Sequence, residues 1–192
     1  MNTDPVGCVY VSMKRFPLVT LALIFANLLA FKLELATGGI PACREYGLIP
    51  AHFAPITLVT SLFFHDPTTI VHLAGNMAAL ALAGSVVEAE LGPFLFASLY
   101  FASGIAGGLM HANINPSSTV PLIGASGAIF GVFAVLGVLH PRLLGFVVGM
   151  AALNIWAAFR GAEGNVSFGC HIGGLCAGTA FAFFCRPVEE AA

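Results

Sequence analysis

Residues 121–132 read PLIGASGAIFGV, a stretch in which one hydroxyl side chain stands among small residues inside a strongly apolar segment. Gly124 precedes Ser126 by two positions, and Gly127 follows it directly. Glycine has no Cβ, so it lets a backbone approach a neighbouring group closely and lets helices pack tightly. A serine in this setting predicts either a close helix contact or a hydroxyl that other groups must reach.

The whole chain has the composition of a membrane protein. Of its 192 residues, 58% are hydrophobic and only 8% are charged. A water-soluble domain could not cover its surface with so few charges, so the lipid bilayer is the expected solvent. The net charge of -2, without a basic cluster, argues against nucleic acid as a partner. The five cysteines do not suggest a disulfide framework.

The apolar segments predict an all-α, polytopic bundle of six transmembrane helices. A spanning helix needs about 20 apolar residues, and turn-forming sequences separate the segments here. The predicted spans are residues 16–36, 69–88, 92–112, 125–140, 143–160 and 167–185. The connection over residues 37–68 contains four prolines yet is apolar, so we expect it to lie in or on the membrane.

The two ends of the chain set the predicted orientation. Residues 1–15 and 186–192 are expected to be short cytoplasmic segments around one domain over residues 16–185. Lys14 and Arg15 precede the first span, and positive charge favours the inner side.

Among the polar side chains inside the predicted spans, four lie in the second, fourth and sixth spans and can reach one another. They are His72 and Asn76 in the second span, Ser126 in the fourth and His171 in the sixth. These spans run in the same direction, so all four side chains lie toward one face, the outer one in this orientation. Ser126 is 15 residues before Pro141, and His171 is 15 residues before Arg186. Both therefore lie about 22 Å from the inner edge, at one depth.

A hydroxyl and an imidazole at one depth suggest a nucleophile and a base. Histidine can take the serine proton and return it to a leaving amine. Glu88 and Glu90 are expected at the inner edge, and Asp66 and Glu163 in loops, so none of these four carboxylates is expected beside the base. The prediction is therefore a dyad without a third member.

The same reasoning predicts an oxyanion hole. His72 and Asn76 are four residues apart and share one helical face. Their side chains can donate hydrogen bonds, as can the backbone N–H of Ser126 at a helix start. Gly124 would allow the backbone to approach them. Structural alternatives remain open, because a membrane serine can simply fill a hydrogen bond and glycines can serve packing alone. A haem or metal carrier using His72 and His171, and a transporter, are further alternatives; we expect no metal and no cofactor.

Three motifs in the chain resemble those of the rhomboid family of intramembrane serine proteases, in its minimal six-helix prokaryotic form. They are GASGAIFG at 124–131, HLAGNM at 72–77 and HIGGLCAG at 171–178, within a similarity from about Pro17 to Cys185. The resemblance implies that Ser126 is the nucleophile and His171 the base, with His72, Asn76 and the Ser126 amide as the oxyanion hole. Gly124 and Gly127 would shape the serine's surroundings, while Gly174 and Gly178 would pack the sixth helix on the fourth.

The resemblance also implies partners and a location. Substrates would be single-pass transmembrane proteins, entering laterally near the second and fifth helices and cut near the outer edge of a bacterial cytoplasmic membrane. A catalytically silent protein that holds membrane clients is the alternative.

The chain departs from the family pattern at four places. The first loop lacks the Trp-Arg pair expected at about Ile56 and Thr57, and Glu90 is acidic where a basic residue is expected. Phe130 takes the place of a tyrosine that stacks on the base, and Cys170 that of an alanine.

Overall fold

The computed structural model describes residues 16–159 and 167–184. The predicted cytoplasmic segments at 1–15 and 186–192 lie outside the described residues. Glu163 and residues 160 and 185, which end the last two predicted spans, also lie outside the described residues.

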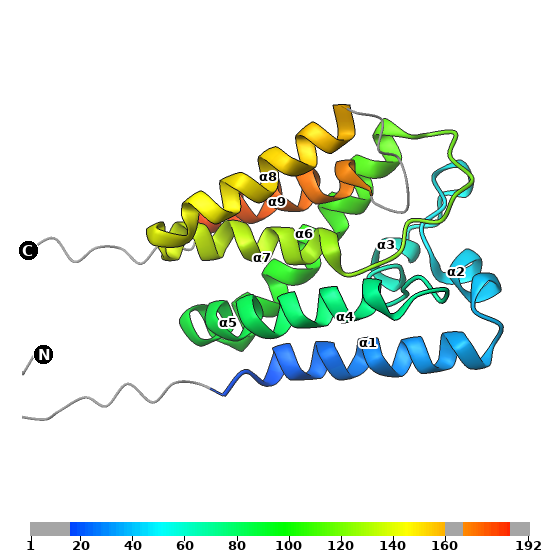
Figure 1. Cartoon of the computed structure of the whole chain (residues 1–192), viewed down its shortest axis with the longest axis horizontal. Helices are drawn as coiled ribbons and strands as arrows, with labels where there is room; N and C mark the ends of the chain where they lie inside the picture. The colour runs from blue at the N-terminus through cyan, green and yellow to red at the C-terminus, as the bar shows by residue number, and fades with distance from the viewer. Residues whose placement is uncertain (1–15, 160–166, 185–192) are drawn as a thin grey trace, which may run out of the picture.

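Within these two ranges, six long helical segments form a bundle and match the six predicted spans (Figure 1). They are α1 (Leu18–Ala36), α4 (Ile70–Ala79) continued through the π-helical turn η2 (Leu80–Gly84) into α5 (Ser85–Leu91), α6 (Pro93–Ile114), α7 (Ser126–Leu139), α8 (Leu144–Phe159) and α9 (Phe168–Phe184). Among the described residues, three segments are long and apolar enough to cross a membrane, namely α1, Ile70–Leu91 and α6, and the other three are shorter apolar helices. The prediction of an all-α membrane bundle is confirmed.

A buried carboxylate joins the start of α1 to α5. Glu88 is 1% exposed, and its carboxylate accepts hydrogen bonds from the backbone N–H of Val19 and of Thr20 and from the Thr20 hydroxyl, at 2.7–2.8 Å. These backbone N–H groups have no partner inside their own helix, and negative charge is favourable at a helix N-terminus. Sequence reasoning placed Glu88 at the inner edge but missed this capping role.

Helix α9 packs between α6 and α7 through glycines. A Cβ on Gly174 would collide with the carbonyl oxygen of Gly127, and one on Gly178 with that of Gly131. On the other side, a Cβ on Gly107 of α6 would come within 2.6 Å of the Cys170 carbonyl oxygen. With no side chains between the backbones, the position of α9 is set by direct contact on two sides.

The long first loop folds into short helices at the end of the bundle where α4 and α7 begin (Figure 1). They are α2 (Ile40–Tyr46), η1 (Pro50–His52) and α3 (Thr57–Thr60). Leu48 is fully buried and pairs with Leu122 through two backbone hydrogen bonds of 3.0 and 2.8 Å. The Gly124 N–H donates to the Ser61 carbonyl at 2.9 Å. The loop therefore braces the segment that leads into Ser126, without the Trp-Arg pair of the family pattern.

Candidate active site

Ser126 and His171 lie in direct hydrogen-bond contact. Ser126 is the first residue of α7 and His171 the fourth of α9, and the His171 Nε2 lies 2.8 Å from the Ser126 Oγ. The His171 side chain is buried, at 8% exposure. Phe130, one turn beyond Ser126, stacks on the imidazole with ring centroids 4.3 Å apart and planes within 7°. The His171 imidazole is thus held in plane by a ring from the helix that carries the Ser126 hydroxyl.

The backbone of Gly124 lies against the side chains of His72 and Asn76. Its φ is +116°, a conformation that other residues rarely adopt. A Cβ there would lie 2.8 Å from the His72 Nε2 and 3.7 Å from the Asn76 Nδ2. Any side chain at position 124 would therefore fill the space next to these donors.

The hydrogen bond at Nδ1 of His72 determines which ring nitrogen carries the proton. The backbone N–H of Asp66 donates to the His72 Nδ1 at 3.3 Å, so the proton of the neutral ring is on Nε2, the atom that faces Gly124. Asn76 uses one amide hydrogen on the carbonyl of His72, at 3.0 Å, which leaves its second hydrogen as a donor. The Ser126 N–H, at the start of α7, adds a third donor.

A buried polar cluster behind His72 connects it to α1. The His65 side chain is fully buried, its ring centroid lies 5.0 Å from that of His72, and its backbone N–H donates to the Glu34 carboxylate at 3.2 Å. The Cys43 thiol donates to the same carboxylate at 2.7 Å. Burial lowers the pKa of His65 to about 4 and raises the pKa of the Cys43 thiol to about 12, so both side chains are neutral at pH 7. The sequence prediction missed this cluster. The signal that could have indicated it was Glu34, a carboxylate inside an apolar span.

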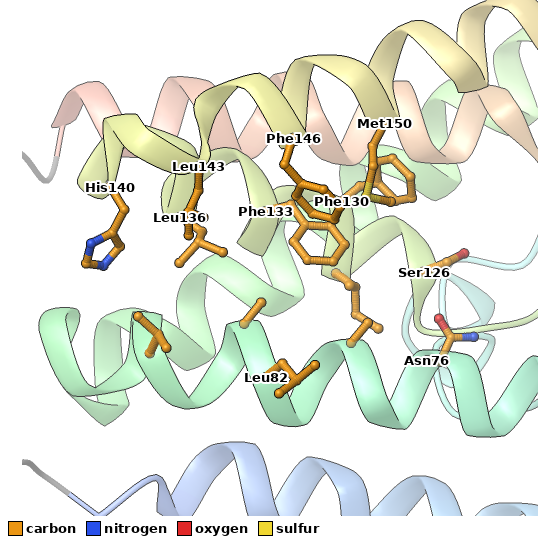
Figure 2. Close-up of a pocket in the computed structure, with 14 residues that line it drawn as sticks. Asn76, Leu82, Ser126, Phe130, Phe133, Leu136, His140, Leu143, Phe146 and Met150 are labelled. Atoms are coloured by element: carbon orange, nitrogen blue, oxygen red, sulfur yellow. The ribbon is translucent and has the colours of Figure 1, made fainter.

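A groove of about 750 Å³ runs between the α4–α5 segment and the α7–α8 pair (Figure 2). Ser126 and Asn76 line one end, and His140 lies at the other. The side chains between the two ends are apolar. They include Leu82, Phe130, Phe133, Leu136, Phe146 and Met150. Such a lining suits an apolar segment whose one end reaches the hydroxyl.

In residues 16–159 and 167–184, no group of three or more His, Cys, Asp or Glu side chains is placed to hold a metal ion.

Fold and site together define a helical membrane protein with a serine–histidine pair at the end of an apolar groove. The Rhomboid domain family model matches residues 52–188. The chain therefore belongs to the rhomboid family and is an integral membrane protein.

Curated relatives extend this finding. The chain is 30% identical to "Putative rhomboid protease YdcA" of Bacillus subtilis (strain 168), over 92% of both chains. It is 29% identical to "Rhomboid protein 1, mitochondrial" of Saccharomyces cerevisiae, over 79% of this chain and 49% of that one. It is 33% identical to "Rhomboid protease GluP" of Bacillus subtilis (strain 168), over 63% of this chain and 24% of that one. Relatives named as proteases support an intramembrane protease.

Proposed function

We propose that this protein is an intramembrane serine endopeptidase that uses a Ser126–His171 dyad. The observation that carries the proposal is the 2.8 Å contact between the Ser126 Oγ and the His171 Nε2 at the end of an apolar groove. A hydroxyl within this distance of an unprotonated imidazole nitrogen can give up its proton as it attacks a carbonyl.

The reaction then proceeds in two halves. The Ser126 Oγ attacks the carbonyl carbon of the scissile peptide while the His171 Nε2 takes the hydroxyl proton. The imidazolium gives this proton to the leaving nitrogen, the C–N bond breaks and an acyl-enzyme remains. Water, deprotonated by the same Nε2, hydrolyses the ester and restores Ser126. Phe130 keeps the imidazole plane fixed through both proton transfers.

The negative charge that develops on the carbonyl oxygen needs fixed donors. In the proposal these are the His72 Nε2–H, the second amide hydrogen of Asn76 and the backbone N–H of Ser126. Gly124 leaves room for the oxygen among them. Donors already in place stabilise the intermediate without reorganisation, and each contributes on the order of 10²–10³ in rate.

The groove suggests the substrate. Its apolar lining fits a transmembrane segment that enters from the lipid between α5 and α8, with the bond to be cut near Ser126. We therefore propose single-pass membrane proteins as substrates, cut toward the outer face of a bacterial cytoplasmic membrane.

Cleavage of a model transmembrane substrate in proteoliposomes tests the proposal. Wild type should release the cut fragment, while Ser126→Ala and His171→Ala should not. Ser98→Ala is the matched control, since the Ser98 hydroxyl bonds only within its own helix, to the Phe94 carbonyl, among the contacts of the described chain. A folded wild type that binds the substrate without cutting it would favour the silent client-binding alternative.

A further inference from the structure

A second serine and histidine lie in contact one turn from the candidate base. The Ser167 Oγ is 2.6 Å from the Nδ1 of His111, which lies in the last turn of α6. Ser167 directly precedes α9, four residues before His171. This contact therefore joins the end of one helix to the start of the helix that carries the base.

Ser167 caps the first turn of α9. Its hydroxyl oxygen accepts the backbone N–H of Cys170 at 3.3 Å, and its carbonyl oxygen accepts the N–H of His171 at 3.2 Å. A serine in this position satisfies N–H groups that have no partner inside the helix. The backbone of His171 is thus held by the residue that His111 contacts.

The surroundings of His111 indicate that its Nδ1 is an acceptor. Besides the Ser167 hydroxyl, the Asn115 Nδ2 approaches this nitrogen at 3.4 Å. The other ring nitrogen, Nε2, is buried and has no hydrogen-bond partner in the part of the chain that the structure describes. A buried polar atom without a partner is costly, so an apolar residue would serve packing better. Histidine at this position is explained by the bond at Nδ1.

We propose that His111 is a positioning residue for the reaction, acting through Ser167 on His171. By accepting the Ser167 hydrogen, its Nδ1 turns the hydroxyl lone pairs toward the Cys170 N–H. This keeps the first turn of α9 wound and holds the His171 ring at the Ser126 hydroxyl. The inference rests on the proposed function.

Packing between the two helix ends transmits the effect. A Cβ on Gly169 would lie 3.1 Å from the Ile114 side chain and 3.7 Å from the His111 Cα, so the first turn of α9 lies directly on the last turn of α6. A shift of about 1 Å at the reacting atoms can cost on the order of 100-fold in rate. Partial fraying of this turn should therefore act mainly on kcat.

The test compares variants that remove the contact with variants that keep it. His111→Leu removes the acceptor, whereas His111→Asn keeps an oxygen near the place of Nδ1. Ser167→Ala removes the cap, whereas Ser167→Thr retains a hydroxyl. Asn113→Ala is the matched control, because Asn113 is exposed on the same turn and bonds to the Leu109 carbonyl.

Two readouts are measured in the full-length protein in detergent. Hydrogen exchange of peptides covering residues 167–175, followed by mass spectrometry, reports the cap without any need for activity. Cleavage of the model transmembrane substrate gives kcat and KM separately. For His111→Leu and Ser167→Ala we expect exchange at the Cys170 and His171 amides to speed up at least about fivefold and kcat to fall about tenfold at unchanged KM. His111→Asn and Ser167→Thr should recover most of the wild-type exchange protection and most of the wild-type kcat.

Unchanged exchange in His111→Leu would overturn the proposal, as would faster exchange with an unchanged kcat. A loss that His111→Asn does not recover would also overturn it, since the Nδ1 contact would not be the cause. Failure of the proposed function is distinct: wild type itself would then not cleave, whatever its exchange rates.

Discussion

Two serine–histidine pairs lie at the same end of α9, and their geometry is similar while their surroundings differ. The Ser126 Oγ is 2.8 Å from a nitrogen of His171, and the Ser167 Oγ is 2.6 Å from a nitrogen of His111. Ser126 lines the apolar groove and stands beside the donors of α4. The Ser167 hydroxyl instead accepts the backbone N–H of Cys170 and caps the start of α9.

A short contact between a hydroxyl and an imidazole does not by itself make a nucleophile. Reactivity also requires space for a substrate and donors for the developing charge. Ser126 lines the groove near the Asn76 side chain, whereas Ser167 is not among the lining residues, which come from the α4–α5 segment and from residues 126–150. The two pairs can therefore be separated by substitution.

The largest expected difference is between the two serines themselves. Ser126→Ala should lower kcat/KM for a transmembrane substrate by on the order of 10⁴-fold or more, because the proposed attacking atom is removed. Ser167→Ala should leave at least several per cent of the activity, since it removes only a cap. Initial rates in proteoliposomes measure both. Comparable losses in two folded variants would contradict the division of roles.

The next largest difference in kcat is expected between variants of the two asparagine side chains, Asn76 near the first pair and Asn115 near the second. Asn76→Ala should lower kcat about 100-fold, less than Ser126→Ala, because two of the three proposed oxyanion donors remain. Asn115, which lies 3.4 Å from the His111 Nδ1, is the control, and Asn115→Ala should change kcat less than about threefold. Steady-state kinetics provides the values. A kcat that is insensitive to Asn76→Ala would remove this residue from the proposed hole.

A smaller effect is expected at Phe130, the ring that stacks on the His171 imidazole. Phe130→Leu should lower kcat about two- to tenfold, because an aromatic pair contributes about 0.5–1.5 kcal/mol beyond its burial. Phe130→Tyr keeps the stacked ring and should retain nearly full activity. If tyrosine and leucine gave equal losses, the stacking would not be the relevant contact.

The smallest effect concerns stability and pH. His65 is neutral in the folded protein down to a pKa of about 4, whereas an unfolded chain takes up this proton below about pH 6.5. Its contribution to stability is complete above about 6.5 and is lost as the pH falls toward 4. Thermal midpoints in detergent at pH 7 and pH 5 should therefore differ more in wild type than in His65→Asn. Equal differences in the two proteins would exclude His65 as a source of the pH dependence.

The fold and the first pair could be predicted from the sequence because both depend on regular features. Apolar segments of spanning length define the helices, and a rise of 1.5 Å per residue places Ser126 and His171 at one depth. The contact between them agrees with that estimate.

The second pair and the first loop could not be predicted in this way. His111 lies on a helix that runs opposite to α9, and its contact with Ser167 depends on how closely α6 and α9 pack through Gly107 and Gly169. The cluster around Glu34 depends on how an irregular loop folds back over α1 and α4. No periodicity in the sequence encodes either arrangement.

The most direct test of the proposed nucleophile is to identify which serine reacts with a fluorophosphonate probe, by mass spectrometry of the labelled, purified protein. We expect label on Ser126, its loss in His171→Ala and its persistence in Ser167→Ala. Label on Ser167, or label that survives in Ser126→Ala, would contradict the assignment of the nucleophile.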